Sequence, residues 1–129
     1  MKYMLMMNVP GTAPYPISTW AKQDAGAHLE FLRQFNRKLN ESGEFVGVAG
    51  LAHPDRARLI RAGRDRAPIT DGVFPETKEF LAGYWIVEVD SPERAYEIAA
   101  AASAAPGPGG TPLNMPIEVR EVMSGLPID

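Results

Sequence analysis

The chain has 129 residues, of which 45% are hydrophobic and 22% are charged, with a formal net charge of -3. This length suits one globular domain, residues 1–129, with one core. The negative charge argues against general nucleic-acid binding, and the absence of cysteine excludes disulfides and thiolate chemistry. No apolar stretch reaches the roughly 20 residues that span a bilayer. Since the N-terminus lacks a signal-peptide pattern, we expect a cytoplasmic protein without membrane contact.

The first third of the chain predicts a strand followed by a long helix. Residues 3–9 are apolar and end before a Pro-Gly pair, which is typical of a buried strand. Ser18 is suited to cap the helix start, and Gly43 can adopt the left-handed conformation that ends a helix. Apolar residues recur along this helix at spacings of three and four, and they are Trp20, Ala27, His28, Phe31, Leu32, Phe35 and Leu39.

The middle of the chain predicts short strands joined by turns. Residues 45–51 form the expected second strand, and residues 56–62 and 67–70 form a hairpin that turns at residues 63–66. Five arginines occur in this hairpin, at positions 56, 58, 61, 64 and 66. Their alternation with apolar residues predicts a solvated strand face, with an anion or acidic-partner site as the alternative.

The last third predicts a strand, a helix and a final strand. Residues 80–90 are rich in aromatic and β-branched residues, and Ser91-Pro92-Glu93 then supplies a cap, a first-turn proline and an acid. The apolar stripe of the second helix consists of Ala95, Ile98, Ala99 and Ala102. A Pro- and Gly-rich segment ends this helix, and residues 116–123 form the last strand.

This order of elements predicts an α+β protein of the ferredoxin-like type, a βαββαβ plait with an inserted hairpin. Both helices of such a plait cover one face of the sheet. If Trp85, Val87 and Val89 point toward the helices, then Tyr84 and Ile86 point to the uncovered face. We therefore expect a homodimer that buries this face.

Residues 70–91 contain a recognisable signature. It reads Asp71-Gly72-Val73-Phe74, then Glu76-Thr77-Lys78-Glu79, then Gly83-Tyr84-Trp85. This signature resembles that of the YCII-related family, also called the DGPF-domain family after its Asp-Gly-Pro-Phe motif, although the proline here is displaced to position 75. The resemblance implies a dimeric α+β barrel with pockets near the boundary of sheet and helices. It also implies relatives that are often encoded near extracytoplasmic-function sigma factors.

The candidate site residues are two histidines and several charged or aromatic groups around the signature. Asp71 and His28 are the candidate catalytic acid–base residues, and the expected ligand-binding residues are His53, Lys78, Glu79 and Tyr84. Each has a structural alternative: His28 as a packed core histidine, His53 as a loop residue, and Asp71 with Gly72 as a turn pair. The histidines lack metal-binding spacing, and the chain lacks phosphate-loop and dinucleotide motifs, so we expect neither metal nor cofactor.

Three functions agree with these residues. The first is binding of a small organic molecule by a homodimer. The second is a cofactor-free lyase or isomerase that uses Asp71 or His28 as a base, with Lys78 or an arginine holding an acidic substrate. The third is an accessory protein-interaction module in a sigma-factor-linked response. A deep pocket walled by His28 or Asp71 favours catalysis, whereas a closed interface without a cavity favours an interaction module.

Overall fold

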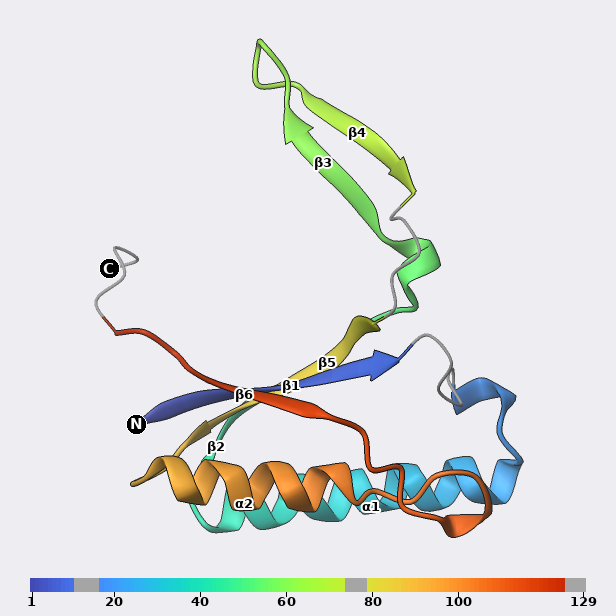
Figure 1. Ribbon diagram of the computed structural model, residues 1–129, viewed down its shortest axis with the longest axis vertical. Helices are drawn as coiled ribbons and strands as arrows, with labels where there is room; N and C mark the ends of the chain where they lie inside the picture. The colour runs from blue at the N-terminus through green and yellow to red at the C-terminus, as the bar shows by residue number, and fades with distance from the viewer. Residues whose placement is uncertain (11–16, 74–78, 125–129) are drawn as a thin grey trace.

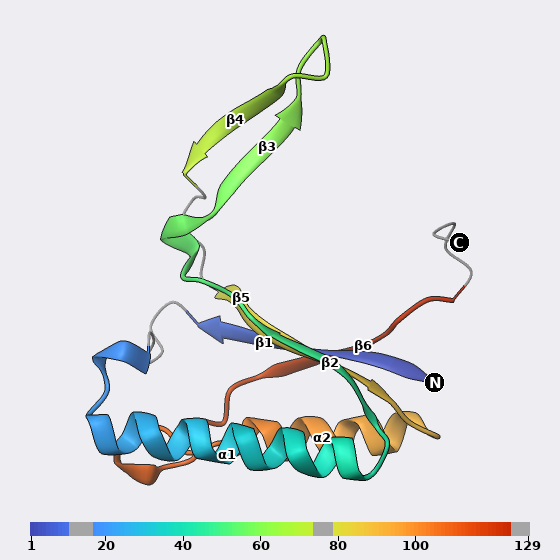
Figure 2. The same cartoon turned by 180° about the vertical axis from the view of Figure 1, so that it is seen from behind.

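A four-stranded antiparallel sheet with two helices on one face forms the body of the protein. The structure, a computed structural model, describes residues 1–10, 17–73 and 79–124. The strand order is β2-β5-β1-β6, and both helices lie on the same side of the sheet (Figures 1 and 2). The elements of the body are β1 (Lys2–Pro10), α1 (Lys22–Glu41), β2 (Phe45–Gly50), β5 (Glu79–Glu88), α2 (Pro92–Ser103) and β6 (Ile117–Glu121). This confirms the predicted α+β class and is consistent with a ferredoxin-like fold.

Alternate residues of the central strands β1 and β5 supply the core. Leu5, Trp85 and Val87 are at most 1% exposed, because successive strand side chains point to opposite faces and these three point to the helices. The helices contribute the buried residues Leu39, Ala95, Ile98, Ala99 and Ala102. On the other face Tyr84 and Ile86 are only half-buried. The predicted alternation along β5 is therefore confirmed.

Three of the four helix ends agree with the prediction, and the exception is the start of α1. The hydroxyl of Ser91 accepts a hydrogen bond from the N–H of Arg94 at 3.2 Å, and Gly43 ends α1 with a φ of 79°. The predicted helix start at Ser18 is wrong. Ile17–Thr19 instead forms a short 3-10 helix, η1, because the N–H of Trp20 bonds to the carbonyl of Ile17 at 3.0 Å. This hydrogen bond closes a single 3-10 turn, and the α-helix α1 begins only at Lys22.

The insertion between β2 and β5 forms a separate hairpin. After a 3-10 turn, η2 (Pro54–Arg56), strands β3 (Arg58–Ala62) and β4 (Pro68–Val73) pair only with each other among the described strands. We call residues 54–73 the arm. It rises from the side of the sheet that the helices leave open (Figures 1 and 2).

The arm corrects one prediction. Asp71 and Gly72 were expected to form a turn, but both lie within strand β4. The reason is the backbone pairing of Val73 with Arg58, which continues the antiparallel ladder past Asp71. The chain reverses instead at Gly63, whose N–H bonds to the carbonyl of Ala67 at 2.7 Å.

Gly83 of β5 lies close to the backbone of the neighbouring strand β2. A Cβ atom at this position would lie 2.6 Å from the carbonyl oxygen of Ala49 and 2.7 Å from the terminal methyl of Met7. The methyl can move, but the carbonyl belongs to the backbone of β2. A larger residue at position 83 would therefore displace the Met7 side chain and force β5 away from β2.

We expect Gly83→Ala to lower the free energy of unfolding by about 1–3 kcal/mol, the usual cost of overpacking. Urea denaturation followed by circular dichroism measures this. The matched control is Gly26→Ala within α1, where a Cβ would meet no atom within 4 Å. Because glycine disfavours helix, this control should stabilise by up to ~1 kcal/mol. Equal effects at both positions would contradict the close packing at Gly83.

An ion pair joins the start of β2 to the start of α2. The guanidinium of Arg94 donates from Nε to Oε2 of Glu44 at 2.8 Å and from Nη2 to Oε1 at 2.9 Å. The hydroxyl of Ser42 donates to the same carboxylate at 2.7 Å. Hydrogen bonds from Arg94 are the main cause that holds the pKa of Glu44 below its usual range. The Glu44 side chain is 16% exposed and that of Arg94 is 44% exposed.

Arg94→Gln should therefore lower stability at neutral pH by about 0.5–1 kcal/mol, a small value because solvent screens the half-exposed guanidinium. A carboxyl whose folded pKa is depressed stabilises the fold above its unfolded pKa and loses that contribution as pH falls through the folded value. The difference between wild type and variant should thus disappear in acid. Thermal unfolding across pH 3–7 measures it, with Arg58→Gln as the control, because the guanidinium of Arg58 donates to the backbone carbonyls of Asp55 and Ala57. A difference that persists unchanged at pH 3 would contradict the ion pair.

Candidate functional site

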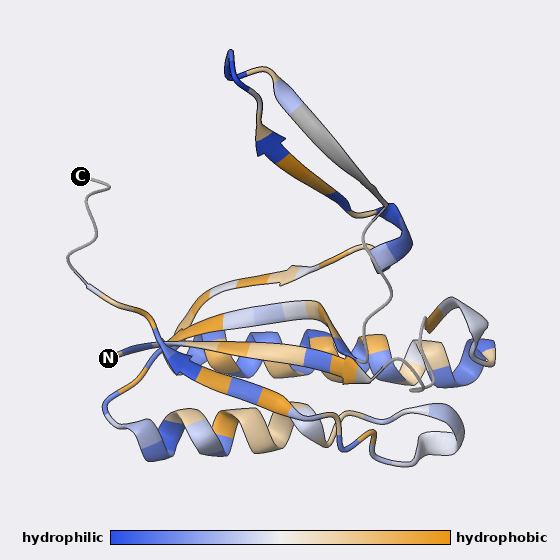
Figure 3. Ribbon diagram, turned by 45° about the horizontal axis from the view of Figure 1, so that its top comes forward, coloured by the Kyte–Doolittle hydropathy of each residue, from blue (hydrophilic) through white to orange (hydrophobic). Residues whose placement is uncertain are grey.

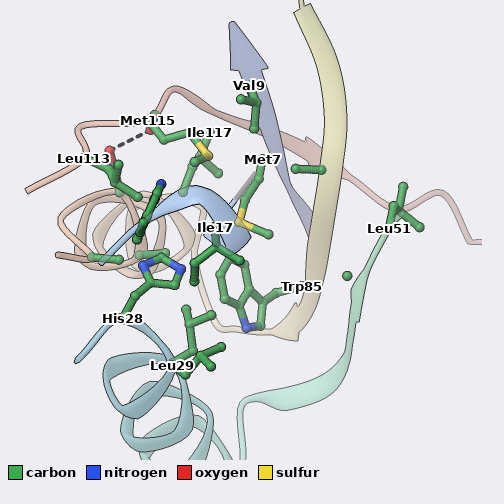
Figure 4. A pocket seen from close by; sticks show the side chains of 17 residues that line it. Met7, Val9, Ile17, His28, Leu29, Leu51, Trp85, Leu113, Met115 and Ile117 are labelled. Carbon is green, nitrogen blue, oxygen red and sulfur yellow. Dashed lines mark hydrogen bonds between the residues drawn. The ribbon is translucent and has the colours of Figure 1, made fainter. Parts of the chain in front are cut away.

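An apolar cavity lies between the helices and the sheet. Its volume is about 260 Å³, and its walls come from both layers and from the segments before α1 and after α2 (Figure 4). The lining residues are Met7, Val9, Ile17, Trp20, His28, Leu29, Leu32, Gly50, Leu51, Ala82, Trp85, Ala102, Ser103, Ala105, Leu113, Met115 and Ile117. We call this space the sheet–helix cavity.

Small residues keep this space open. Ala82 of β5 and Ala102 and Ala105 around the end of α2 are buried and line the cavity. A leucine or phenylalanine at these positions would extend into the space that the alanines leave. The segment after α2 then returns as a lid, held by hydrogen bonds from the Leu113 N–H to the Ala105 carbonyl (2.9 Å) and from the Ser103 hydroxyl to the Met115 carbonyl (2.7 Å).

His28 is the only ionisable side chain among the described residues that line the sheet–helix cavity. It stands on α1 with its imidazole directed into the cavity beside Ile17 (Figure 4). Its Nδ1 lies 2.9 Å from the carbonyl oxygen of Pro106. Because a carbonyl only accepts, Nδ1 must carry the proton. The edge of the ring also meets Trp20, with ring centroids 5.2 Å apart at 83°.

These contacts fix the chemistry that His28 can offer. With its proton held on Nδ1, the neutral imidazole has its lone pair on Nε2. Two other polar side chains on the cavity wall, those of Trp85 and Ser103, are hydrogen-bonded within the protein. The indole N–H of Trp85 donates to the side-chain oxygen of Asn36 at 2.7 Å, and the Ser103 hydroxyl is bound as described above. Among the described residues, His28 therefore offers a ligand in this cavity a hydrogen-bonding nitrogen surrounded by mainly apolar walls.

A second pocket lies at the base of the arm. Its volume is about 470 Å³, and its polar lining residues are His53, Arg56 and Glu79. The rings of His53 and Phe80 meet edge to face at 5.6 Å between centroids. The Nδ1 atom of His53 accepts a hydrogen bond from the N–H of Asp55 at 3.4 Å and lies 3.2 Å from the Asp55 carboxylate. This pocket places His53 and Glu79 along one wall.

The structure separates the other predicted site residues. Asp71 lies in β4 on the arm, on the opposite side of the sheet from α1 and His28 (Figure 1), so these two residues do not form one constellation. Lys78 lies outside the described residues, as does Phe74 of the signature. Tyr84 is half-buried on the sheet face opposite the helices. The ligand-binding roles of His53, Lys78, Glu79 and Tyr84 stay predictions.

Several cavity residues were not predicted from the sequence. Ser103, Leu113 and Met115 belong to the end of α2 and the segment that follows it, and their spacing gives no signal of a shared wall. Within residues 1–10, 17–73 and 79–124, no three His, Asp or Glu side chains gather closely enough to hold a metal ion. Neither helix that the structure describes is apolar enough over a sufficient length to cross a membrane.

Two comparisons with known proteins show what this chain is similar to. A segment of 82 residues is 31% identical to an uncharacterized protein of Rhizobium meliloti (strain 1021), and it covers 64% of this chain. The match spans 66% of that protein, slightly less than two thirds of its length. Residues 1–110 match the YCII-related domain. Because this match extends from β1 through the segment after α2, the chain belongs to the YCII-related family.

Proposed function

We propose that this YCII-related protein binds a small, mainly apolar organic molecule in the sheet–helix cavity and acts as a homodimer. The observation that carries the proposal is an apolar cavity in which His28, the single ionisable residue among the described lining residues, directs its ring inward. Ligand pockets are typically apolar with a few placed polar groups, and drug-sized ligands occupy roughly 300–1,000 Å³. A cavity of about 260 Å³ suits a smaller molecule.

The chemistry of His28 defines the ligand further. Its Nε2 atom accepts a hydrogen bond when the ring is neutral, so a hydroxyl or enol on an apolar ring or chain matches the cavity. No lysine or arginine is among the described lining residues. A permanent anion would therefore have only a protonated His28 as a counter-ion. The ligand class that agrees best is an uncharged molecule with one hydroxyl group.

A second candidate function is a cofactor-free lyase or isomerase, and the fixed orientation of His28 favours it. The Pro106 carbonyl holds Nδ1 as a donor, which keeps Nε2 available as a general base inside the cavity. A base that is oriented by a third group and surrounded by apolar walls has the arrangement that proton transfer needs. His28 is the base of this proposal, since Asp71 lies on the arm.

Ligand binding can be tested without labels, because both tryptophans of the chain, Trp20 and Trp85, line the cavity. We expect phenol to change the tryptophan fluorescence and to bind more tightly than toluene, its counterpart without the hydroxyl. His28→Gln should weaken phenol binding about 5–10-fold, the value of one hydrogen bond, and leave toluene binding unchanged. Loss of both ligands together with a large loss of stability would show a structural role for His28.

A cavity-filling variant completes this test. Ala102→Leu should prevent binding of both probes, whereas Ala100→Leu, an exposed position on the same helix, should leave binding intact. If phenol and toluene leave the fluorescence of the wild-type protein unchanged at millimolar concentration, the cavity is not a binding site for this class of molecule.

The homodimer rests on the open face of the sheet. Met4 and Met6 of β1 and Tyr84 and Ile86 of β5 are half-buried there, on paired positions of neighbouring strands. An apolar patch of this kind at the centre of a sheet is typical of an interface. Packing two such faces together is the arrangement of a dimeric α+β barrel, and a stable interface of this type buries about 1,200–2,000 Å² in total.

We expect a dimer in analytical ultracentrifugation at micromolar concentration, and we expect Ile86→Asp to dissociate it because the new carboxylate would be buried unpaired. Tyr96→Asp, at an exposed aromatic residue on α2, is the matched control and should leave the dimer intact. Circular dichroism checks that both variants are folded. A wild-type monomer, or dissociation by Tyr96→Asp alone, would contradict the open-face interface.

A further inference from the structure

The arm exposes apolar and basic side chains that its own body does not cover. Every residue of β3 is exposed, and Leu59 and Ile60 are 41% and 56% exposed. Figure 3 shows these hydrophobic residues in the middle of β3, between hydrophilic neighbours. An isolated two-stranded hairpin is only marginally stable in water. The arm therefore has an unburied apolar segment that a partner could cover.

The charge of the arm is opposite to that of the remaining chain. Residues 54–73 hold five of the 13 basic and three of the 16 acidic residues, which gives the arm a net charge of +2 and leaves -5 on the rest. The open face itself is electrically mixed, because Lys2 and Arg120 share it with Glu88 and Glu118. The charge opposite to that of the arm belongs to the rest of the chain as a whole, and a second copy offers that charge to the arm.

The position of the arm also favours a second copy of the chain as its partner. It rises on the open side of the sheet, away from both helices (Figures 1 and 2). A strand of five residues is roughly 17 Å long, whereas two sheets packed face to face lie about 10 Å apart. A second copy seated on the open face would consequently lie beside the arm along most of its length.

We propose that the arm clasps the second copy of the chain in the dimer, with Ile60 covered by the partner and Arg58, which shares its face of β3, directed at the negatively charged body of that copy. This inference rests on the proposed open-face dimer. Because a two-fold interface uses the same surfaces on both copies, each copy gives one arm and receives one. The arm then adds affinity and orientation to contacts that the sheets begin.

Matched charge reversals test the proposal. Arg58→Glu combined with Arg64→Glu should raise the dimer dissociation constant at least tenfold, since it places negative charge against an acidic partner. The control combines Arg33→Glu with Arg37→Glu on the exposed side of α1, which changes the net charge equally and should leave the constant unchanged. Ile60→Ser on the arm should weaken the dimer without any change of charge. Sedimentation equilibrium measures the three variants and the wild type.

A cross-link identifies what the arm touches. The chain has no cysteine, so Ala62→Cys, at an exposed position on the same face of β3 as Ile60, carries a benzophenone maleimide at one defined place. Mixing ¹⁴N- and ¹⁵N-labelled protein separates cross-links between copies from those within one copy. We expect cross-links between copies, to peptides of β5 or β6.

The outcomes separate the two proposals. If the arm variants leave the dissociation constant unchanged and cross-links form only within one copy, while Ile86→Asp still dissociates the dimer, the clasp is wrong and the open-face dimer stands. A monomeric wild-type protein overturns both.

Discussion

The pairing of β1 with β5 is the interaction on which the rest of the structure depends. These antiparallel strands are the two central strands of the sheet, and their alternating side chains separate two environments. Leu5, Trp85 and Val87 are buried under the helices, while Met6 and Tyr84 face the opposite side. A shift of one residue in this register would exchange the two faces and expose the core. The absence of a side chain at Gly83 lets the strands and Met7 come together at the cavity end of this pair.

The sheet–helix cavity follows from short side chains at one end of that core. Toward the start of α2, Ala95 and Ile98 pack closely against the sheet, but beyond Ala102 the chain leaves the helix and returns as an irregular segment. This segment supplies the Pro106 carbonyl that orients His28. The same stretch of chain thus closes the cavity and selects the tautomer of its only ionisable lining residue among those described. The proposed ligand binding would therefore depend on this segment, because loss of the segment would release His28.

The open face and the arm form the side of the molecule at which we propose the dimer contacts. The insertion between β2 and β5 leaves the plan of the sheet intact, since β2 and β5 still pair with each other. Its cost is an exposed hairpin that has few contacts of its own. A second copy would cover both the apolar centre of the sheet and this hairpin. In that assembly the sheet–helix cavity lies on the other side of the sheet, so ligand binding and dimer contacts use separate surfaces.

The sequence by itself determined the elements that depend on local patterning. The alternation in residues 80–90, the Ser91 cap, the alanine stripe of α2 and the α+β class could all be predicted, because a strand or an amphipathic helix records its buried face in its periodicity. Tertiary structure decided the rest. Ile17–Thr19 forms η1 because of one backbone bond, Asp71 lies in a strand because β3 pairs past it, and His28 meets Pro106 across 78 residues of chain. Contacts between residues so distant in sequence leave no local signal. The family resemblance implied a pocket at the boundary of sheet and helices, but most residues that line the cavity could be identified only in the folded chain.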